Sequence, residues 1–448
     1  MTDGTGKDLG LKQQPTGKPA SRFFARGWLM VLCAYIVAVI TQGMGIYSFT
    51  MLRGSIAQSL GVTPPEVAAT FSFYVMTLAV VGLFVGTVIE KLGLRISLII
   101  SAVLFSGGLL LQTVANDLTF LYFACAIMGA GSAFGGVLVI TGIPSNWFVK
   151  HRGLANGIVW SSTFIGSLLT TNLIAAVISS ADWHTAVYML ATISAAVLFI
   201  ASFVLKWRPQ DIGLLPDGMS KEESAAIAEQ AGSAKVVGLT RFQAIKTPTF
   251  WILAAGILMI GFAEMGPTQS LPSYFTARGN DLATAAAFMS FFTFTGLIGK
   301  ICAGFIIDRI GARWAFVLIE IFAAAGLLML AFADASSSIV YMYVAIALFG
   351  LGENASIVCF SASTGKFLGV KYYAHIFGLI FLAKAMGDSV GAPLIPAMAA
   401  GDAGWTGAFI AAAIVALIAG AVFFFAKKSK LLTGLEEQAA IDIVKDRD

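Results

Sequence analysis

The sequence predicts an all-α membrane protein in which twelve transmembrane helices form two six-helix bundles. Hydrophobic residues make up 58% of the 448 residues, charged residues only 12%, and the mean hydropathy is +0.86. An ordinary soluble domain carries about 25% charged residues. Almost every apolar run reaches about 20 residues, which is enough to cross a hydrocarbon core of about 30 Å. The length of the chain therefore reflects the number of membrane-spanning helices rather than the number of soluble domains.

The spans are expected in two sets of six, separated by a polar linker. The linker is too polar to enter the membrane and long enough to join two bundles. We expect a tail over residues 1–26, a first bundle over 27–205, the linker over 206–247, a second bundle over 248–426 and a tail over 427–448. The apolar segments begin near Gly27, Glu66, Ile96, Leu118, Gly153 and Thr185, and again near Pro248, Leu282, Trp314, Ile339, His375 and Trp405.

Basic residues gather on one face of the predicted bundles. The tails, the linker and the loops on their side hold 24 of the 28 Lys and Arg residues, and the opposite face keeps only Arg53 and Arg278. Short cytoplasmic loops retain positive charge. Both termini are therefore expected in the cytoplasm, in a multi-pass protein of the bacterial inner membrane, where the lipid bilayer surrounds the chain.

An internal repeat supports the division into halves. The loop after the second span and the loop after the eighth share an acidic residue, a basic residue, two glycines and an arginine at a constant offset. An acidic group can pair with basic residues at helix ends, and glycines permit close helix contact. We expect a conformational latch at Gly86, Glu90, Lys91 and Arg95, and at Gly304, Asp308, Arg309 and Arg313.

A second repeat relates the fifth span to the eleventh. Gly157 and Gly166 are spaced like Gly378 and Gly387, at an offset of 221 residues. The two spans are therefore expected to be structural equivalents.

Two lysines lie inside predicted spans, and both belong to the second half. Lys300 is in the eighth span and Lys384 in the eleventh, while the repeat places Gly82 and Thr163 at the equivalent positions of the first half. A charge in mid-membrane costs about 2.5–3.5 kcal/mol and usually faces a cavity or a partner. Two ammonium groups facing a cavity would suit an anion. Alternatively, each lysine reaches toward the interface or pairs with a carboxylate, Asp388 being the nearest for Lys384.

Acidic and hydrogen-bonding residues supply further candidates. A carboxyl group shielded from water holds a proton more readily, so Glu264, Glu353 and Asp388 are proton-coupling candidates, ahead of Glu320. The alternative is a permanent lysine partner. Further candidates for substrate binding, which could equally be interface anchors, are Tyr35, Gln42, Tyr47 and Tyr274.

From about Gly27 to Phe425 the chain resembles the monocarboxylate and oxalate:formate porters of the major facilitator superfamily. The resemblance is carried by the repeated loop, by QGMGIYSF at residues 42–49, by WFVKHRGLANGI at 147–158 and by GLIFLAKAMGDSVG at 378–391. It implies the major facilitator fold and carboxylate binding by Lys300 and Lys384. Two positions depart from the pattern, because Lys300 replaces the usual arginine, and Gly296 stands where monocarboxylate transporters tend to place an aspartate.

These observations predict a secondary transporter of small organic anions that works by alternating access. A proton-coupled monocarboxylate symporter and a carboxylate:carboxylate antiporter are the two leading hypotheses, and a non-transporting receptor on the same fold is the alternative from another class. The sequence contains no nucleophile-base set, metal-ligand cluster or phosphate loop. We therefore expect no enzyme activity, cofactor, metal site or nucleic-acid partner.

Overall fold

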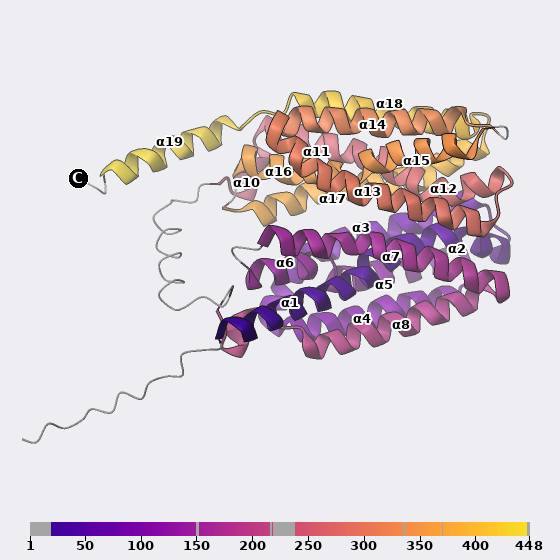
Figure 1. The fold of residues 1–448 in the computed structure, drawn as a ribbon, viewed down its shortest axis with the longest axis horizontal. Helices are drawn as coiled ribbons and strands as arrows, with labels where there is room; N and C mark the ends of the chain where they lie inside the picture. Colours follow the sequence, from indigo (N-terminus) through magenta and orange to yellow (C-terminus); the bar gives the residue numbers. More distant parts are fainter. Residues whose placement is uncertain are drawn as a thin grey trace, which may run out of the picture.

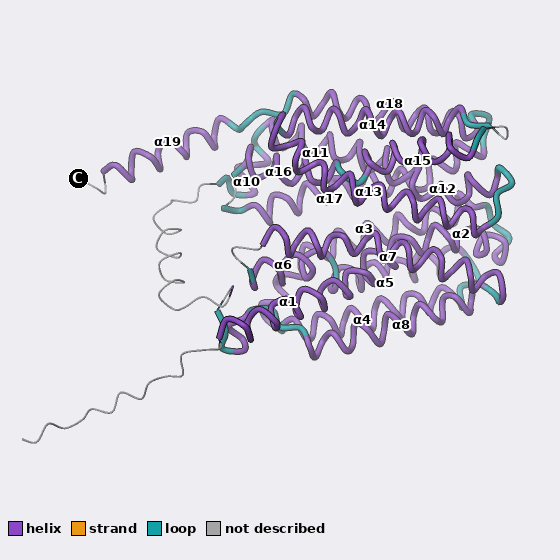
Figure 2. The backbone as a smooth tube through the Cα atoms, in the orientation of Figure 1, coloured by secondary structure: helices purple, strands orange, loops and turns teal. Residues whose placement is uncertain are grey.

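The computed structural model describes residues 19–148, 152–215, 217, 238–334, 337–369 and 371–445. Most of the predicted N-terminal tail and linker, part of the WFVKHRG motif and the last three residues lie outside these ranges. Within them the chain is mostly helical, with most loops at the two ends of the molecule and short breaks inside two spans (Figure 2).

Twelve helical segments of the described chain are long and apolar enough to cross a membrane. Each begins within two residues of the predicted start, so the prediction of twelve spans is confirmed. Caps fix several of the ends. Asp281, for example, accepts a hydrogen bond from the amide of Thr284 at 2.8 Å. Hydrogen bonds from the Thr284 side chain and amide also lower the pKa of the Asp281 carboxyl.

The described residues of the first bundle form nine helical elements, and two of its six spans are divided into shorter pieces. Its elements are α1 (Pro19–Ala38), the π-helix η1 (Val39–Met44), α2 (Gly45–Leu60), α3 (Pro64–Leu92), α4 (Leu94–Thr113), α5 (Leu118–Gly135), α6 (Val137–Trp147), α7 (Arg152–Ser180) and α8 (Trp183–Val204).

The second bundle repeats this pattern. Its elements are α11 (Pro248–Ile260), the π-helix η4 (Gly261–Met265), α12 (Gly266–Ala277), α13 (Leu282–Ile310), α14 (Ala312–Phe332), α15 (Ile339–Glu353), α16 (Ser356–Leu368), α17 (Tyr373–Ala400) and α18 (Gly404–Phe424). The 3₁₀ turn η2 (Pro209–Ile212) and α10 (Arg241–Ile245) precede this bundle, and α19 (Lys430–Lys445) follows it.

The two bundles lie side by side, with α10 and α19 at one end of the molecule (Figure 1). We call this end the termini side. Hydrogen bonds join the bundles in the opposite half of the spans: Asn172 Nδ2 donates to Ser290 Oγ at 3.0 Å, and Gln269 Nε2 donates to the carbonyl of Ile46 at 3.3 Å. Ser72 and Ser389 add hydroxyl-to-carbonyl bonds between α3 and α17. The bundles are therefore closed against each other on the side away from the termini.

Helix irregularities recur at equivalent places in the two halves. The π-helices η1 and η4 interrupt the first and seventh spans, and each ends in a Met-Gly step, Met44-Gly45 and Met265-Gly266. The fourth span breaks at Gly136 and the tenth span at Asn354 and Ala355. Because π-turns and breaks release backbone groups from the regular ladder, they are common at functional sites.

The repeated glycines of α7 and α17 play matching roles. A Cβ on Gly166 would meet the backbone of Gly43 in the first span, and a Cβ on Gly387 would meet the backbone of Phe262 in the seventh. Gly157 faces open space. The second glycine of each pair thus lets its helix approach the π-helical span of its own half.

Candidate functional site

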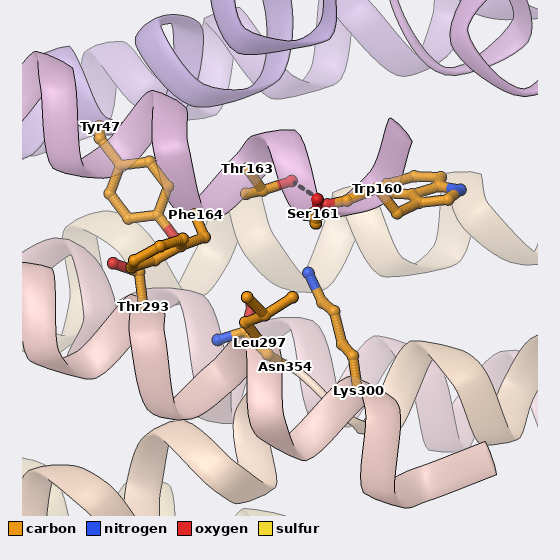
Figure 3. Close-up of a pocket in the computed structure, with 9 residues that line it drawn as sticks. All are labelled: Tyr47, Trp160, Ser161, Thr163, Phe164, Thr293, Leu297, Lys300 and Asn354. Carbon is orange, nitrogen blue, oxygen red and sulfur yellow. Dashed lines mark hydrogen bonds between the residues drawn. The ribbon is translucent and has the colours of Figure 1, made fainter. Parts of the chain in front are cut away.

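A small cavity lies between the two bundles, chiefly between α7 and α13 (Figure 3). The volume that the centres of water molecules can occupy is only about 10 Å³, which is about the space for one water molecule. A larger solute therefore requires the bundles to separate. The lining residues are Tyr47, Trp160, Ser161, Thr163, Phe164, Thr293, Leu297, Lys300 and Asn354.

Lys300 is the charged residue of this lining. Figure 3 shows its side chain leaving α13 with the amine directed toward Ser161 and Trp160 of α7. Among the described residues Lys300 forms no salt bridge, although Glu353 and Glu264 are close enough to interact with its charge. An ammonium group with three donors is thus presented across the cavity without a fixed ionic partner.

Gly296 makes room for a polar group from another helix. A Cβ on Gly296 would lie 2.7 Å from Cγ of Asn354, so the Asn354 side chain fills the space that a larger residue would need. Asn354 in turn donates a hydrogen bond to the carboxylate of Glu353. The position at which the family resemblance expects an aspartate is therefore occupied by an amide from the break in the tenth span, with Glu353 directly behind it.

The first bundle contributes hydroxyl and aromatic groups to the opposite wall. Tyr35 is not a lining residue, although its hydroxyl lies near the side chain of Ser161. Thr163, the repeat equivalent of Lys384, lines the cavity and donates to the carbonyl of Trp160 at 3.2 Å. Tyr47 is 4% exposed and completes the wall beside Phe164 (Figure 3).

Lys384 is held by Asp388 one turn along α17. Its Nζ lies 2.8 Å from the Asp388 Oδ1, and the two side chains are 12% and 4% exposed. Asp388 Oδ1 also lies beside Gly261 of η4, where an added Cβ would come within 2.9 Å. The two lysines thus differ, because Lys384 has an ionic partner in the helix and Lys300 does not.

Three further carboxyl groups lie within the spans of the second bundle, two of them buried and that of Glu353 half-buried. Glu264 of η4 is 2% exposed and Glu320 of α14 is 1% exposed. One oxygen of Glu264 and both oxygens of Glu320 have no hydrogen-bond partner among the described residues. Glu353 interacts electrostatically with both lysines. Together these groups form what we call the charged cluster: Glu264, Lys300, Glu320, Glu353, Lys384 and Asp388.

Four of the six predicted substrate ligands lie outside the cavity lining, namely Tyr35, Gln42, Tyr274 and Lys384. Tyr274 is fully buried, and its hydroxyl donates to the carbonyl of Leu330 at 2.6 Å, while the Arg278 guanidinium lies 4.3 Å from its ring centroid. Gln42 sits in η1, and its side-chain nitrogen packs near Gly136.

The repeated loops have the same backbone shape in both halves. Gly93 and Gly311 adopt φ of 84° and 79°, which an L side chain rarely adopts. Arg95 lies 4.2 Å from the ring centroid of Phe203, and Arg313 lies 5.3 Å from that of Phe367. The two arginines therefore pack on aromatic rings, and the described residues give neither Glu90 nor Asp308 of the predicted latch an ion pair.

Several lining residues were missed because they carry no charge. Thr293, Leu297 and Lys300 are spaced by four and three residues, which places them on one face of a helix. Counting back from Lys300 at helical spacing would have found the other two. Asn354 had no such signal, because its position depends on where the tenth span breaks.

The comparisons with known proteins agree with this architecture. The family model of the Major Facilitator Superfamily matches residues 31–392 and 279–441. Monocarboxylate transporter 12 of Xenopus laevis is 22% identical over 400 residues, covering 86% of this chain and 85% of that protein. The probable sulfoacetate transporter SauU of Cupriavidus necator is 23% identical over 296 residues, covering 64% of this chain and 65% of that protein. A partially occluded inward-open structure of the xylose transporter XylE from E. coli superposes with a TM-score of 0.70 at 13% identity, covering 91% and 99% of the two chains.

Proposed function

The chain belongs to the major facilitator superfamily and is a secondary transporter, and we propose that it carries small monocarboxylate anions together with protons. One observation carries this proposal: Lys300 presents its amine in the cavity between the bundles without a salt bridge to any described residue. A carboxylate that enters the cavity would accept charge-assisted hydrogen bonds from this amine and neutral ones from the hydroxyl groups of α7.

The state of Lys384 favours a monoanion over a dianion. Asp388 already balances its charge at 2.8 Å, so a dicarboxylate would have to displace a buried ionic partner. Breaking such a pair costs about 3–5 kcal/mol. A monocarboxylate needs only Lys300, so a monoanion is the favoured substrate, and carboxylate:carboxylate exchange remains the alternative to symport.

The charged cluster supplies a reason for proton coupling. Four carboxyl groups face two ammonium groups, so full ionisation would leave two uncompensated negative charges in a buried site. Unpaired buried charges are strongly unfavourable, and such groups bind protons instead. A carboxylate bound at Lys300 adds a third negative charge beside Glu353. Binding of substrate and of a proton then promote each other, as linkage requires.

The names of two relatives are consistent with this substrate class. One is called a monocarboxylate transporter and the other a probable sulfoacetate transporter, and both names refer to small organic acids. We further propose that the termini side faces the cytoplasm of a bacterial inner membrane, because the sequence assigns 24 of its 28 Lys and Arg residues to the tails, the linker and the loops on their side.

Uptake by purified protein in proteoliposomes tests the proposal. Labelled lactate, pyruvate, formate and oxalate would be offered with and without an acidic exterior, at a membrane potential clamped to zero. We expect uptake of at least one monocarboxylate without internal substrate, stimulated several-fold by external acid. Uptake that occurs only with an internal carboxylate would establish exchange, and binding without uptake would establish a receptor.

Variants of Lys300 and Glu353 test the proposed roles of these two side chains in substrate binding and proton coupling. Lys300→Gln should weaken apparent affinity by about 10- to 150-fold, since a hydrogen bond to a charged group is worth about 1.5–3 kcal/mol. Lys371→Gln, which removes a lysine outside the cavity lining, is the matched control. Glu353→Gln should keep carboxylate exchange and lose stimulation by acid. Unchanged uptake by Lys300→Gln would refute the site.

A further inference from the structure

A second and larger cavity opens on the termini side of the second bundle, away from the cavity between the bundles. Its volume is about 430 Å³, within the range of pockets that hold small ligands. It is formed where α13, α16 and α18 end and α14 begins, the end of the molecule from which α19 extends (Figure 1). The lining residues are Ile310, Gly311, Ala312, Arg313, Trp314, Lys366, Phe367, Phe424 and Lys428.

The lining contains three cations and no acidic residue. Arg313, Lys366 and Lys428 come from three separate segments of the chain. Lys428 also contacts Glu436, in an ion pair in which both side chains are 42% exposed. Such exposed pairs are weak, so the ammonium group remains available. Three positive groups that converge on one cavity match a phosphate group, which offers several acceptor oxygens and a negative charge.

Apolar and aromatic side chains form the remaining wall, and they are exposed. Trp314 is 58% exposed, Ile310 is 46% exposed and Phe424 is 37% exposed. The rings of Trp314 and Phe424 meet edge-on with centroids 4.9 Å apart. These residues stand at the ends of membrane spans, where aromatic side chains line the boundary between hydrocarbon and headgroups. The cavity is therefore cationic and has an apolar wall at the depth of lipid headgroups.

We propose that this cavity binds an acidic phospholipid, with the headgroup phosphate held by Arg313, Lys366 and Lys428 and the upper acyl chain against Trp314 and Phe424. Free phosphate esters share the phosphate chemistry, but they would leave the exposed aromatic wall uncovered. The lipid would tie together the ends of four spans of the second bundle.

The first bundle does not repeat this chemistry. The repeat equivalent of Arg313 is Arg95, and both arginines pack on an aromatic ring, but the equivalent of Trp314 is Ile96. The two loops share their backbone shape, as the glycine φ angles show. Only the second bundle therefore combines this backbone with an aromatic wall and three converging cations among the described residues.

Thermal unfolding of the detergent-solubilised full chain tests the proposal. The protein would be titrated with phosphatidylglycerol, with phosphatidylcholine of the same acyl chains, and with sodium phosphate or glycerol 3-phosphate. We expect phosphatidylglycerol alone to raise the unfolding midpoint in a saturable manner. Equal effects of the two lipids would overturn the proposal. Equal protection by the soluble phosphates would overturn the assignment to lipid.

Charge-removal variants test the residues. Loss of one basic residue near a lipid surface costs about fivefold in affinity, so Arg313→Gln/Lys366→Gln/Lys428→Gln should bind phosphatidylglycerol about 100-fold more weakly. Lys246→Gln/Lys371→Gln/Lys427→Gln removes three charges from the same side, outside the lining, and should bind as the wild type does. An equal loss in both variants would overturn the site. Lys366→Gln alone, with an expected fivefold loss, provides the test if the triple variant does not fold.

Discussion

The buried pair between Lys384 and Asp388 is expected to stabilise the second bundle rather than to bind substrate. At a separation of 2.8 Å and an effective dielectric constant of about 20, the attraction between the two charges is about 6 kcal/mol. Desolvation offsets much of it. Loss of one partner, however, leaves the other buried without compensation and costs about 3–5 kcal/mol. We therefore expect Lys384→Met and Asp388→Asn each to destabilise the protein by this amount.

A double-mutant cycle measures the coupling directly. Asparagine keeps the shape of the aspartate, which matters because Asp388 Oδ1 lies against Gly261. In the variant Lys384→Met/Asp388→Asn neither member of the pair is left charged without the other, so the loss of stability should be at least about 2 kcal/mol smaller than the sum of the two single losses. Reversible SDS titration in mixed micelles gives the free energies, and the double variant should retain monocarboxylate uptake. Additive losses below about 1 kcal/mol each would refute the reasoning and return Lys384 to the substrate site.

Glycine packing, a buried charge and a contact between the bundles give three more predictions. Gly166→Ala should destabilise the protein by about 1–3 kcal/mol through overpacking. Gly157 faces open space, so Gly157→Ala should be neutral or should stabilise the protein by up to about 1 kcal/mol. Equal effects of the two substitutions on chemical unfolding would contradict this packing. Arg53 is 2% exposed, and none of its guanidinium nitrogens has a hydrogen-bond partner among the described residues. Arg53→Met should therefore raise the free energy of unfolding by about 1–4 kcal/mol. A lower free energy of unfolding would show that the fold needs the charge. Asn172 and Ser290 join the two bundles. In a background without the native cysteines, a disulfide formed in the variant Asn172→Cys/Ser290→Cys should stop uptake until reductant is added. Continued uptake would show that the bundles need not separate at this contact.

The number and limits of the spans were predictable because each span carries its own signal. A run of apolar residues that is long enough to cross the bilayer needs no tertiary information to be recognised. The duplicated loop likewise predicts two halves, and Gly93 and Gly311 share the same positive-φ backbone conformation.

The irregular parts of the spans were not predictable from local sequence. The π-helix η1 lies where Gly43 packs against Gly166, a contact between two helices that are distant in sequence. The break at Asn354 follows two glycines, but such glycines serve equally in close packing. The charged residues of the site were found because charge is rare in a span. Asn354, whose position depends on the break, was not.

The division of chemistry between the two bundles links binding to movement. Lys300 and the rest of the charged cluster belong to the second bundle, whereas Ser161, Thr163 and Trp160 belong to the first. A ligand shifts a conformational equilibrium only through interactions that differ between states. An anion held by Lys300 alone would bind equally well whether the bundles were apart or together. An anion that also reaches Ser161 and Thr163 gains those contacts only when α7 and α13 approach, so it promotes closure around itself. Removing the Ser161 hydroxyl should therefore weaken closure and transport more than it weakens the initial capture of the anion, whereas loss of Lys300 should weaken both.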